Sequence, residues 1–337
     1  MVVRAKARII GIGSYLPSNI LTNQDLEKMV DTSDDWITSR TGMKERRLAS
    51  VQEFSSDMGA AAAKTALKNA SLNPEQIDMV LVATMSPDYI SPSTAAIIQS
   101  AIGAVNASAF DIQAACSGYI YGLSTAKAFV ESGIYKNILV IASEKMSAFV
   151  DYKDRNTCVL FGDGASAAVV SQKGDGLVID SICLGADGAL ASLLMIPGGG
   201  ARHPTSHETV AQRMHYMKME GKELFKHAVR KMSSAATDCL AKAGLNDGDI
   251  SWLIPHQANA RIIDAIAKSL SIPQEKIYKT LHKYGNTSAS SIAIALDELT
   301  QEYTIKPGEH LLLAAFGGGL TWGALLLTKI LASSEKK

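Results

Sequence analysis

The chain has 337 residues, of which 47% are hydrophobic and 20% charged, as is typical of globular proteins. Its 33 basic and 33 acidic side chains cancel, which argues against a nucleic-acid-binding protein because such proteins are usually basic. Four cysteines without CxxC spacing favour neither a zinc ribbon nor a disulfide scaffold. The length suits one large core or two fused halves of about 150 residues each.

The sequence also argues against a membrane protein. Charges interrupt the apolar residues of segment 1–8, so it lacks the apolar core of a signal peptide. The uncharged stretch 311–328 approaches transmembrane length, but three consecutive glycines, 317–319, divide it. Two buried strands joined by a glycine loop fit this stretch better than a membrane helix. We therefore expect a cytoplasmic protein that does not enter a membrane.

Short aliphatic runs alternate with amphipathic or alanine-rich segments, which predicts an α/β fold with mostly parallel, buried strands. In chain order we expect a strand at 7–14, a helix at 57–69, a strand at 79–84, a helix at 94–102, an extended segment at 105–111, a helix at 117–131, strands at 138–143 and 165–171, a helix at 221–243, a strand at 251–254, helices at 258–270 and 291–302, and strands at 310–315 and 323–328. The polar, glycine-rich segment 171–176 marks a seam, after which the pattern of strand, connection and long helix begins again. Segment 198–220 is expected to be a long exposed loop.

Cys116 lies in a turn of small residues between the extended segment 105–111 and the helix 117–131. The positive end of that helix stabilises a thiolate, so the sequence predicts a thiol pKa below its usual value of about 8.5. Taken alone, a cysteine in such a turn is more often a buried spacer than a nucleophile. The residues downstream therefore decide its role.

Two downstream polar residues also precede expected helices. His256 follows a buried strand, and ligands of α/β sheets gather at the carboxyl ends of strands, although a lone histidine is more often structural. Asn286 lies in a polar turn whose later residues, Ser290 or Ser291, are expected to cap the next helix. A thiolate can carry an acyl group as a thioester, while imidazole and amide groups can donate hydrogen bonds to an oxyanion. Cys116, His256 and Asn286 together favour acyl transfer.

The chain resembles the β-ketoacyl-acyl-carrier-protein synthase III family. Its members are condensing enzymes of the thiolase fold that start fatty-acid synthesis. The resemblance spans nearly the whole chain. It rests on these motifs in this order: GIGSYLP (11–17), DWITSRTG (35–42), Cys116, FGDGA (161–165), PHQAN (255–259), YGNTS (284–288) and FGGGLTWG (316–323). It implies a five-layered αβαβα fold from two duplicated halves in a homodimer. Half 1–174 carries the nucleophilic cysteine, and half 175–337 carries the histidine and asparagine.

The resemblance also implies a reaction. An acyl-CoA primer would acylate Cys116. His256 and Asn286 would then promote decarboxylation of malonyl-acyl carrier protein, and the resulting carbanion would attack the thioester in a Claisen condensation. The backbone N–H groups of Cys116 and Gly318 would form a second oxyanion hole. The scheme needs no metal and no redox cofactor. It needs an anionic Cys116, and a proton on the imidazole nitrogen of His256 that faces the substrate.

The resemblance further implies binding surfaces. Trp36 and Arg40 would pack against the adenine of CoA, Arg155 would complete that wall, and Asn259 would contact pantetheine. Basic residues flank the expected entrance and would meet the acidic acyl carrier protein, although such clusters are usually only solvated faces. These basic residues are Arg261, Lys226 and Lys268.

One position departs from the family pattern. Many members carry a bulky residue just before the proline that Pro92 matches, and that residue reaches across the dimer to limit acyl length. This chain has Ser91 there, so we expect a primer pocket that is more open than an acetyl-only site.

Other classes fit part of the pattern. A hydroxymethylglutaryl-CoA synthase needs an acid that segment 83–87 lacks. A head-to-head condenser of two acyl chains, or a starter enzyme for a secondary metabolite, stays open as an alternative with a different acyl substrate. A cysteine hydrolase would use the histidine as a general base and release a free acid. A scaffolding protein would need none of the three residues Cys116, His256 and Asn286.

Overall fold

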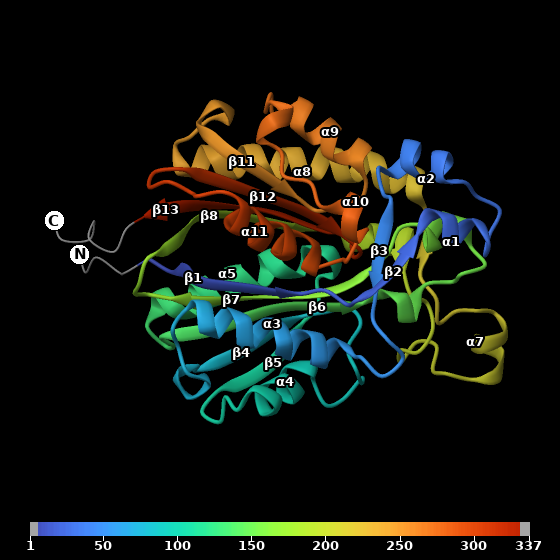
Figure 1. The fold of residues 1–337 in the computed structure, drawn as a ribbon, viewed down its shortest axis with the longest axis horizontal. Coiled ribbons are helices and arrows are strands. Elements are labelled where there is room, and N and C mark those ends of the chain that lie inside the picture. The colour runs from blue at the N-terminus through green and yellow to red at the C-terminus, as the bar shows by residue number, and fades with distance from the viewer. Residues whose placement is uncertain (1–5, 331–337) are drawn as a thin grey trace.

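The computed structural model describes residues 6–330, so most of segment 1–8, where no signal peptide is expected, lies outside the described residues. The largest sheet has the order β11-β12-β13-β8-β1-β7-β6-β4-β5. Its two halves meet where β1 (Arg8–Tyr15) pairs with β8 (Gly176–Ala186), and only two residue pairs make that junction. Beyond the junction the half-sheets form separate layers with helices between and outside them (Figure 1).

The N-terminal half-sheet contains β1, β4 (Met79–Ala83), β5 (Ser108–Ile112), β6 (Asn137–Lys145) and β7 (Asp163–Ser171). Strand β4 is parallel to β5 and β6, whereas β7 is antiparallel to β6 and β1. Two helices, α3 (Ser55–Asn69) and α4 (Thr94–Ile102), cover its outer face. Helix α5 (Gly118–Ser132) covers the inner face.

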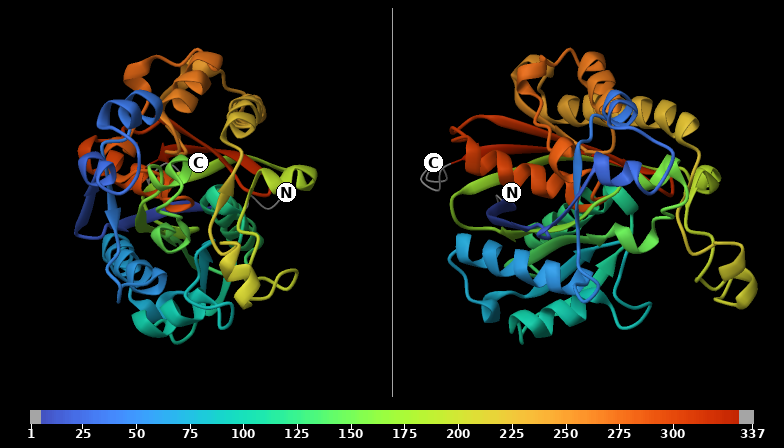
Figure 2. Two further views of the ribbon diagram at one scale, coloured as in Figure 1. Left: turned by 90° about the vertical axis from the view of Figure 1, so that its right-hand side faces the viewer. Right: turned by 45° about the vertical axis from the view of Figure 1, so that its right-hand side comes forward.

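The C-terminal half repeats this arrangement with β8, β11 (Ile250–Pro255), β12 (His310–Gly317) and β13 (Thr321–Ile330). Strands β11 and β12 are parallel, and β13 is antiparallel to β12 and β8. Helices α8 (Gly221–Ala243) and α9 (Ala260–Ser269) lie outside, and α11 (Ser290–Glu302) lies inside beside α5 (Figures 1 and 2). The expected αβαβα fold of two duplicated halves is therefore confirmed.

Alternation along single strands builds three apolar layers. In β4, Val80 and Val82 join the outer layer under α3 and α4, while Leu81 joins the central layer between the half-sheets. In β12, Leu312 faces outward to α8 and α9, and Leu313 faces the central layer. Because both faces are covered, these strands read as continuous apolar runs.

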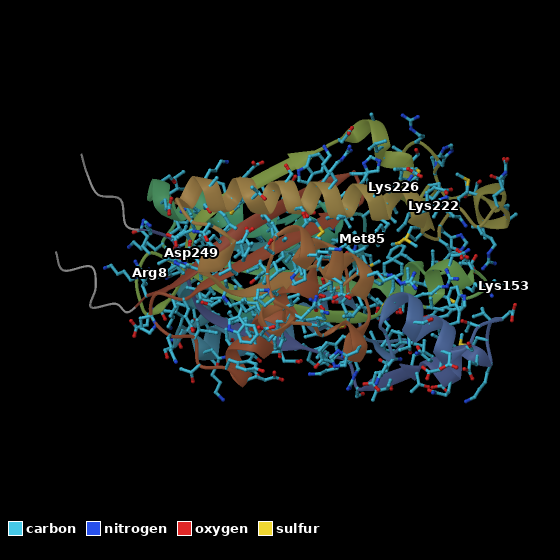
Figure 3. All side chains as sticks on the ribbon, turned by 90° about the horizontal axis from the view of Figure 1, so that it is seen from above. Arg8, Met85, Lys153, Lys222, Lys226 and Asp249 are labelled. Atoms are coloured by element: carbon cyan, nitrogen blue, oxygen red, sulfur yellow. The ribbon has the colours of Figure 1, made fainter. Side chains whose placement is uncertain are left out.

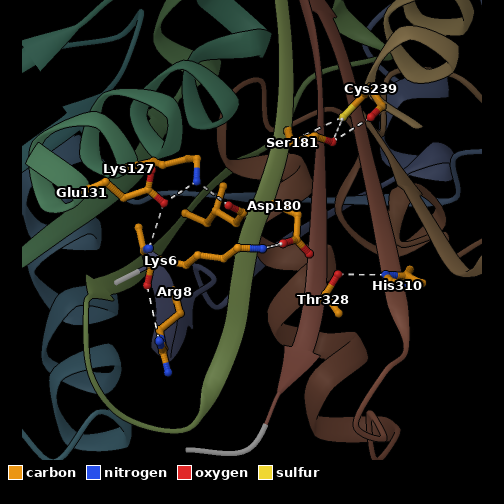
Figure 4. A network of polar contacts seen from close by, with 11 residues as sticks. Lys6, Arg8, Lys127, Glu131, Asp180, Ser181, Cys239, His310 and Thr328 are labelled. Atoms are coloured by element: carbon orange, nitrogen blue, oxygen red, sulfur yellow. Dashed lines mark hydrogen bonds and ion pairs between the residues drawn. The ribbon is translucent and has the colours of Figure 1, made fainter. Parts of the chain in front are cut away.

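Polar contacts tie the halves together at the β1–β8 junction (Figure 4). Lys127 of α5 forms an ion pair with Glu131 and donates to the carbonyl of Ile179 in β8 at 2.7 Å. Lys6 forms an ion pair with Asp180 at 2.8 Å. The predicted division at 174/175 falls between β7 and β8, and it stays a prediction.

The structure corrects several element predictions. The expected loop 198–220 contains α7 (His207–Ala211) and β10 (Lys218–Met219), which pairs with β9 (Leu194–Met195), and α7 projects from the body (Figure 2). The expected strands also omitted β8, although it has 11 residues. Periodicity further missed several elements of at most eight residues. These are β2 (Asn19–Thr22), α1 (Asn23–Glu27), α2 (Asp34–Thr41), β3 (Glu45–Leu48), α6 (Arg155–Cys158) and α10 (Leu281–Tyr284). Within residues 6–330, no helix has both the length and the apolar character needed to cross a membrane.

Candidate active site

A cavity of about 490 Å³ lies at the carboxyl ends of parallel strands from both halves. Cys116 follows β5, His256 follows β11, and Gly318 follows β12; all three line the cavity together with Asn286. The structure thus brings together the residues predicted to carry the chemistry. The rest of the wall is largely apolar and includes Met85, Met217, Met219, Leu224, Phe225 and Met232.

The turn that holds Cys116 is strained and closely packed. Ala115 has a φ of 44°, a left-handed conformation that costs an L-residue about 1–3 kcal/mol. A Cβ on Gly317 would lie 2.6 Å from the backbone nitrogen of Cys116, so only glycine lets β12 approach this closely. Apart from bonds within regular helices and strands, neither the N–H of Cys116 nor that of Gly318 donates to the backbone of another residue within residues 6–330. Both residues line the cavity.

The thiol of Cys116 does not have the low pKa that the sequence predicts. Cys116 lies in a single 3₁₀ turn directly before α5, which is the predicted place at a helix start, but its side chain is buried. Burial raises the pKa of Cys116 to about 12, and the nearby Glu144 carboxylate also raises it. Removal of the thiolate from water is the largest of the effects on this pKa. The free thiol therefore keeps its proton at neutral pH.

His256 is held as a neutral hydrogen-bond donor. Its Nδ1 lies 2.7 Å from the hydroxyl oxygen of Ser291, and that oxygen already accepts the N–H of Gln257. The hydroxyl proton of Ser291 is thus free to be donated to Nδ1, which leaves the imidazole proton on Nε2. Burial lowers the pKa of His256 to about 3, so the imidazole stays neutral at physiological pH.

Asn286 presents its amide N–H₂ in the same way. Its Oδ1 accepts the N–H of Ser288 at 2.9 Å, so the side-chain nitrogen is left for the cavity. Its backbone donates to the carbonyl of Leu160 at 2.8 Å and accepts from Gly162 at 3.1 Å, which fixes the turn. His256 and Asn286 therefore offer two neutral donors to one space.

The expected N-cap of α11 is wrong. The cap position is Ala289, and no side chain caps the helix. The hydroxyl of Ser291 bonds to His256, and the hydroxyl of Ser290 donates to the carbonyl of Thr287. A serine motif beside a helix start is ambiguous in sequence because the same hydroxyl can cap the helix or orient a neighbouring side chain.

The predicted adenine wall forms a stack outside the cavity. The guanidinium carbon of Arg40 lies 5.2 Å from the ring centroid of Trp36, and that of Arg155 lies 4.9 Å from it. Asn259 lines the cavity and donates to the carbonyl of Arg40 at 3.1 Å, so it joins the stack to the cavity mouth. It is also the N-cap of α9, which begins two residues later than expected.

The other predicted residues lie away from the cavity wall. Arg261 is exposed and donates to the carbonyl of Ser39 beside the stack, at 3.1 Å. Lys226 lies on the N-terminal part of α8, where it pairs with Glu223 (Figure 3). Lys268 lies in the last turn of α9, and Ser91 is exposed. Cavity lining thus includes none of these four residues.

Two groups at the site do not follow from the sequence patterns. Ser291 reads as a helix cap but bonds to His256, and the buried carboxyl of Glu144 influences Cys116. The sequence does contain a sign of Glu144: it is an acidic residue within the largely apolar strand segment 137–145, where a charged side chain is unexpected.

Buried neutral His256 predicts acid sensitivity of the fold. Its pKa is about 6.5 unfolded and about 3 folded, so its contribution to stability is complete above pH 6.5 and is lost as pH falls towards 3. Between pH 7 and pH 5 we expect the free energy of unfolding of the native protein to fall about 2 kcal/mol more than that of His256→Gln. Urea titrations of both proteins at each pH measure this, and equal losses would contradict it.

Comparison with known proteins agrees with this geometry. Residues 110–188 match the family described as 3-Oxoacyl-[acyl-carrier-protein (ACP)] synthase III, and residues 240–329 match its C-terminal part. A β-ketoacyl-[acyl-carrier-protein] synthase III of Chlamydia caviae is 59% identical over 96% of this chain and 97% of its own, and one of Caldanaerobacter subterraneus is 54% identical over 97% and 99%. A crystal structure of 3-oxoacyl-[acyl-carrier-protein] synthase III from Aquifex aeolicus superposes with a TM-score of 0.89 at 50% identity, covering 96% of this chain and 99% of that one. The chain therefore belongs to the β-ketoacyl-acyl-carrier-protein synthase III family.

Proposed function

We propose that this protein condenses an acyl-CoA primer with malonyl-acyl carrier protein, releasing CoA and CO₂ and giving the β-ketoacyl-acyl carrier protein that starts fatty-acid synthesis. The observation that carries the proposal is the pair of neutral donors beside the thiol. The free nitrogens of His256 and Asn286 share one cavity with Cys116, and each has its other polar atom bound elsewhere.

Each step uses a group with the right chemistry. The sulfur of Cys116 attacks the primer, and the backbone N–H groups of Cys116 and Gly318 stabilise the oxyanion before CoA leaves. Loss of CO₂ from the malonyl group puts negative charge on its thioester oxygen, and His256 and Asn286 donate to that enolate. The enolate carbon then attacks the acyl-Cys116 thioester. None of these steps requires a metal or a redox cofactor.

A cysteine hydrolase fits the site less well. Hydrolysis needs a base that removes a proton from water. With a pKa of about 3, His256 is a weak base but an adequate hydrogen-bond donor.

A cytoplasmic location is part of the proposal, and the four cysteines, all of which are free thiols, suit a reducing compartment.

Acylation is the first test. Intact-protein mass spectrometry after incubation with a panel of acyl-CoAs should show an acyl mass gain that Cys116→Ala abolishes. Malonyl-acyl carrier protein should then discharge the acyl group into a β-ketoacyl product. His256→Ala and Asn286→Ala should still be acylated but condense at least about a hundredfold more slowly, because each removes a donor to the enolate. Discharge to free acid would instead favour a hydrolase.

The acyl carrier protein is proposed to dock beside the cavity mouth. Arg261 is exposed there, and its contact with Ser39 places a positive charge beside the Trp36 stack. Lys226, and with less geometric support Lys268, would extend the basic surface. Such surfaces attract an acidic partner over long range.

Charge reversal tests this docking surface. In Arg261→Glu we expect KM for malonyl-acyl carrier protein to rise about tenfold, with kcat little changed and a weaker dependence of KM on salt. Lys64→Glu, an equally exposed charge reversal on α3, is the control. An equal rise in both variants would show only an effect of net charge.

A homodimer is also proposed. Strand β5 is the last strand at its end of the sheet, and Phe110 on it is 39% exposed. An exposed edge strand readily pairs with another chain. Tyr89 and Ile90, the two residues before Ser91, are 61% and 91% exposed. Ser91 does not line its own chain's cavity, so it can limit a primer only from a partner subunit.

The size of residue 91 should set primer length. Turnover of acetyl-, branched- and octanoyl-CoA by the native protein should show acceptance of primers longer than acetyl. Ser91→Phe should lower octanoyl turnover at least about tenfold more than acetyl turnover, because a ring fills space that the serine leaves open. Ser50→Phe, at another exposed serine, is the control. Strict acetyl preference in the native protein would contradict the open pocket.

A further inference from the structure

A buried carboxylate lies next to the cavity without a role in the chemistry described above. Glu144 is fully buried on β6. Its Oε2 accepts hydrogen bonds from the hydroxyls of Thr84 (3.1 Å) and Ser86 (2.6 Å) and from the backbone N–H groups of Met85 (3.0 Å) and Ser86 (3.2 Å). Every one of these partners is a donor, so the site is built for a carboxylate anion.

The other oxygen of Glu144 faces the turn that carries Asn286. Oε1 accepts the N–H of Ala289 at 3.4 Å. The neighbouring hydroxyl, that of Ser288, is buried and has no hydrogen-bond partner of regular geometry within residues 6–330. It is near enough to both Glu144 and Cys116 to oppose, in part, the rise in pKa that burial causes in each. Ser288 directly precedes Ala289, whose N–H reaches Glu144, so its hydroxyl belongs to the turn that adjoins both groups.

Close packing holds this arrangement in place. A Cβ on Gly118, two residues after Cys116, would lie 3.0 Å from the Cβ of Ala83 and 3.4 Å from that of Ala289. The Cys116 turn, the end of β4 and the Ser288–Ala289 turn are thus in contact at small residues.

The thiol needs a proton acceptor because burial keeps it protonated. Within residues 6–330, Glu144 acts on the charge of the thiol, and His256 lines the same cavity. The next residue of β6, Lys145, turns away and donates to the carbonyls of Ser50 and Glu53. Burial lowers the proton affinity of His256 and raises that of Glu144, since the pKa of the carboxyl is raised. Glu144 is therefore the better acceptor of the two.

We propose that Glu144, acting through the hydroxyl of Ser288, receives the proton of Cys116 during acylation. The thiol proton passes to the Ser288 oxygen as the hydroxyl proton of Ser288 passes to Oε1 of Glu144, so one negative charge moves from carboxylate to sulfur. The sulfur then bonds to the acyl carbon, and CoA leaves as a thiolate that solvent protonates. When condensation expels the Cys116 thiolate, the proton returns along the same path and restores the thiol and the carboxylate.

The acylation step rests on the proposed function, but the proton transfer can be tested without it. Alkylation of Cys116 by iodoacetamide requires the same deprotonation and none of the proposed substrates. The full-length protein is alkylated across pH 5–9, and peptide mass spectrometry separates Cys116 from the other three cysteines. If Glu144 accepts the proton, the alkylation rate of Cys116 should be nearly independent of pH once the carboxyl is deprotonated. At high pH the rate should rise again, because the thiolate then forms directly.

Variants decide between a relay and a structural role. In Glu144→Gln and Ser288→Ala, alkylation at pH 7 should slow at least about tenfold and then rise about tenfold per pH unit, as a thiol titrating alone would. The double variant should be no slower than either single variant, and Glu144→Asp should restore part of the plateau. Asp163→Asn, a buried carboxylate whose partners are Ala49 and Ser147, should keep the native profile.

Contrary outcomes are equally clear. An unchanged pH profile of alkylation in Ser288→Ala would overturn the relay. A profile shifted to lower pH in Glu144→Gln would also overturn it, because it would show that Glu144 only repels the thiolate. Slower alkylation by the same factor at every pH would indicate a structural role and would also overturn it. If Glu144→Gln does not fold, Ser288→Ala decides, because it removes one hydroxyl and keeps the backbone N–H that bonds to Asn286. Failure of acyl transfer with an intact alkylation plateau would count against the proposed function and leave the relay standing.

Discussion

The contact between the two half-sheets through α5 and α11 is the constraint on which the site depends. Both helices lie in the central apolar layer, and the segments that enter them meet closely: a Cβ on Gly118 would lie 3.4 Å from that of Ala289 and 3.0 Å from that of Ala83 in β4. Cys116 precedes one helix and Asn286 the other, so packing of the layer brings the two together. The close approach of Gly317 to the Cys116 backbone adds the end of β12 to the same place.

Burial in this layer also determines the electrostatics. It raises the pKa of Cys116 and lowers that of His256, so neither group carries charge at rest. The site instead offers neutral donors whose orientation is fixed beforehand: Ser291 holds the imidazole, and the N–H of Ser288 holds the amide of Asn286. Donors that need no reorientation stabilise a developing enolate most effectively. Five donors surround the carboxyl of Glu144 and favour its charged form, whereas burial raises its pKa.

The small elements before α3 hold the Trp36 stack beside Asn259, which lines the cavity. Arg46 of β3 is fully buried, donating to the carbonyl of Val159 at 3.1 Å and to Asn23 at 2.6 Å. Asn23 in turn donates to the carbonyl of Met43 at 2.9 Å. Burial lowers the pKa of Arg46 to about 10, which still leaves it charged at neutral pH. This brace holds α2, and with it Trp36 and Arg40, beside the segment that contributes Phe161 to the cavity.

Much of this protein could be predicted from local sequence. Continuous apolar runs such as Met79–Ala83 predict strands buried on both faces, and the 23 residues of α8 were predicted with the observed ends, because periodicity and glycine stops are local properties. Cys116, His256 and Asn286 could be named because each stands next to an expected helix in a motif of its own. Short elements such as α2 and β3 could not, since a few residues carry too little periodicity.

Tertiary structure alone decided the state and partners of those residues. The helix start beside Cys116 predicted a low pKa, and burial between the half-sheets reversed it. Ser291 reads as a cap but bonds to a histidine 35 positions away, and Glu144 contacts segments 58 to 145 positions away. Desolvation and long-range hydrogen bonds depend on which segments pack together in space, a property that no local stretch of sequence contains.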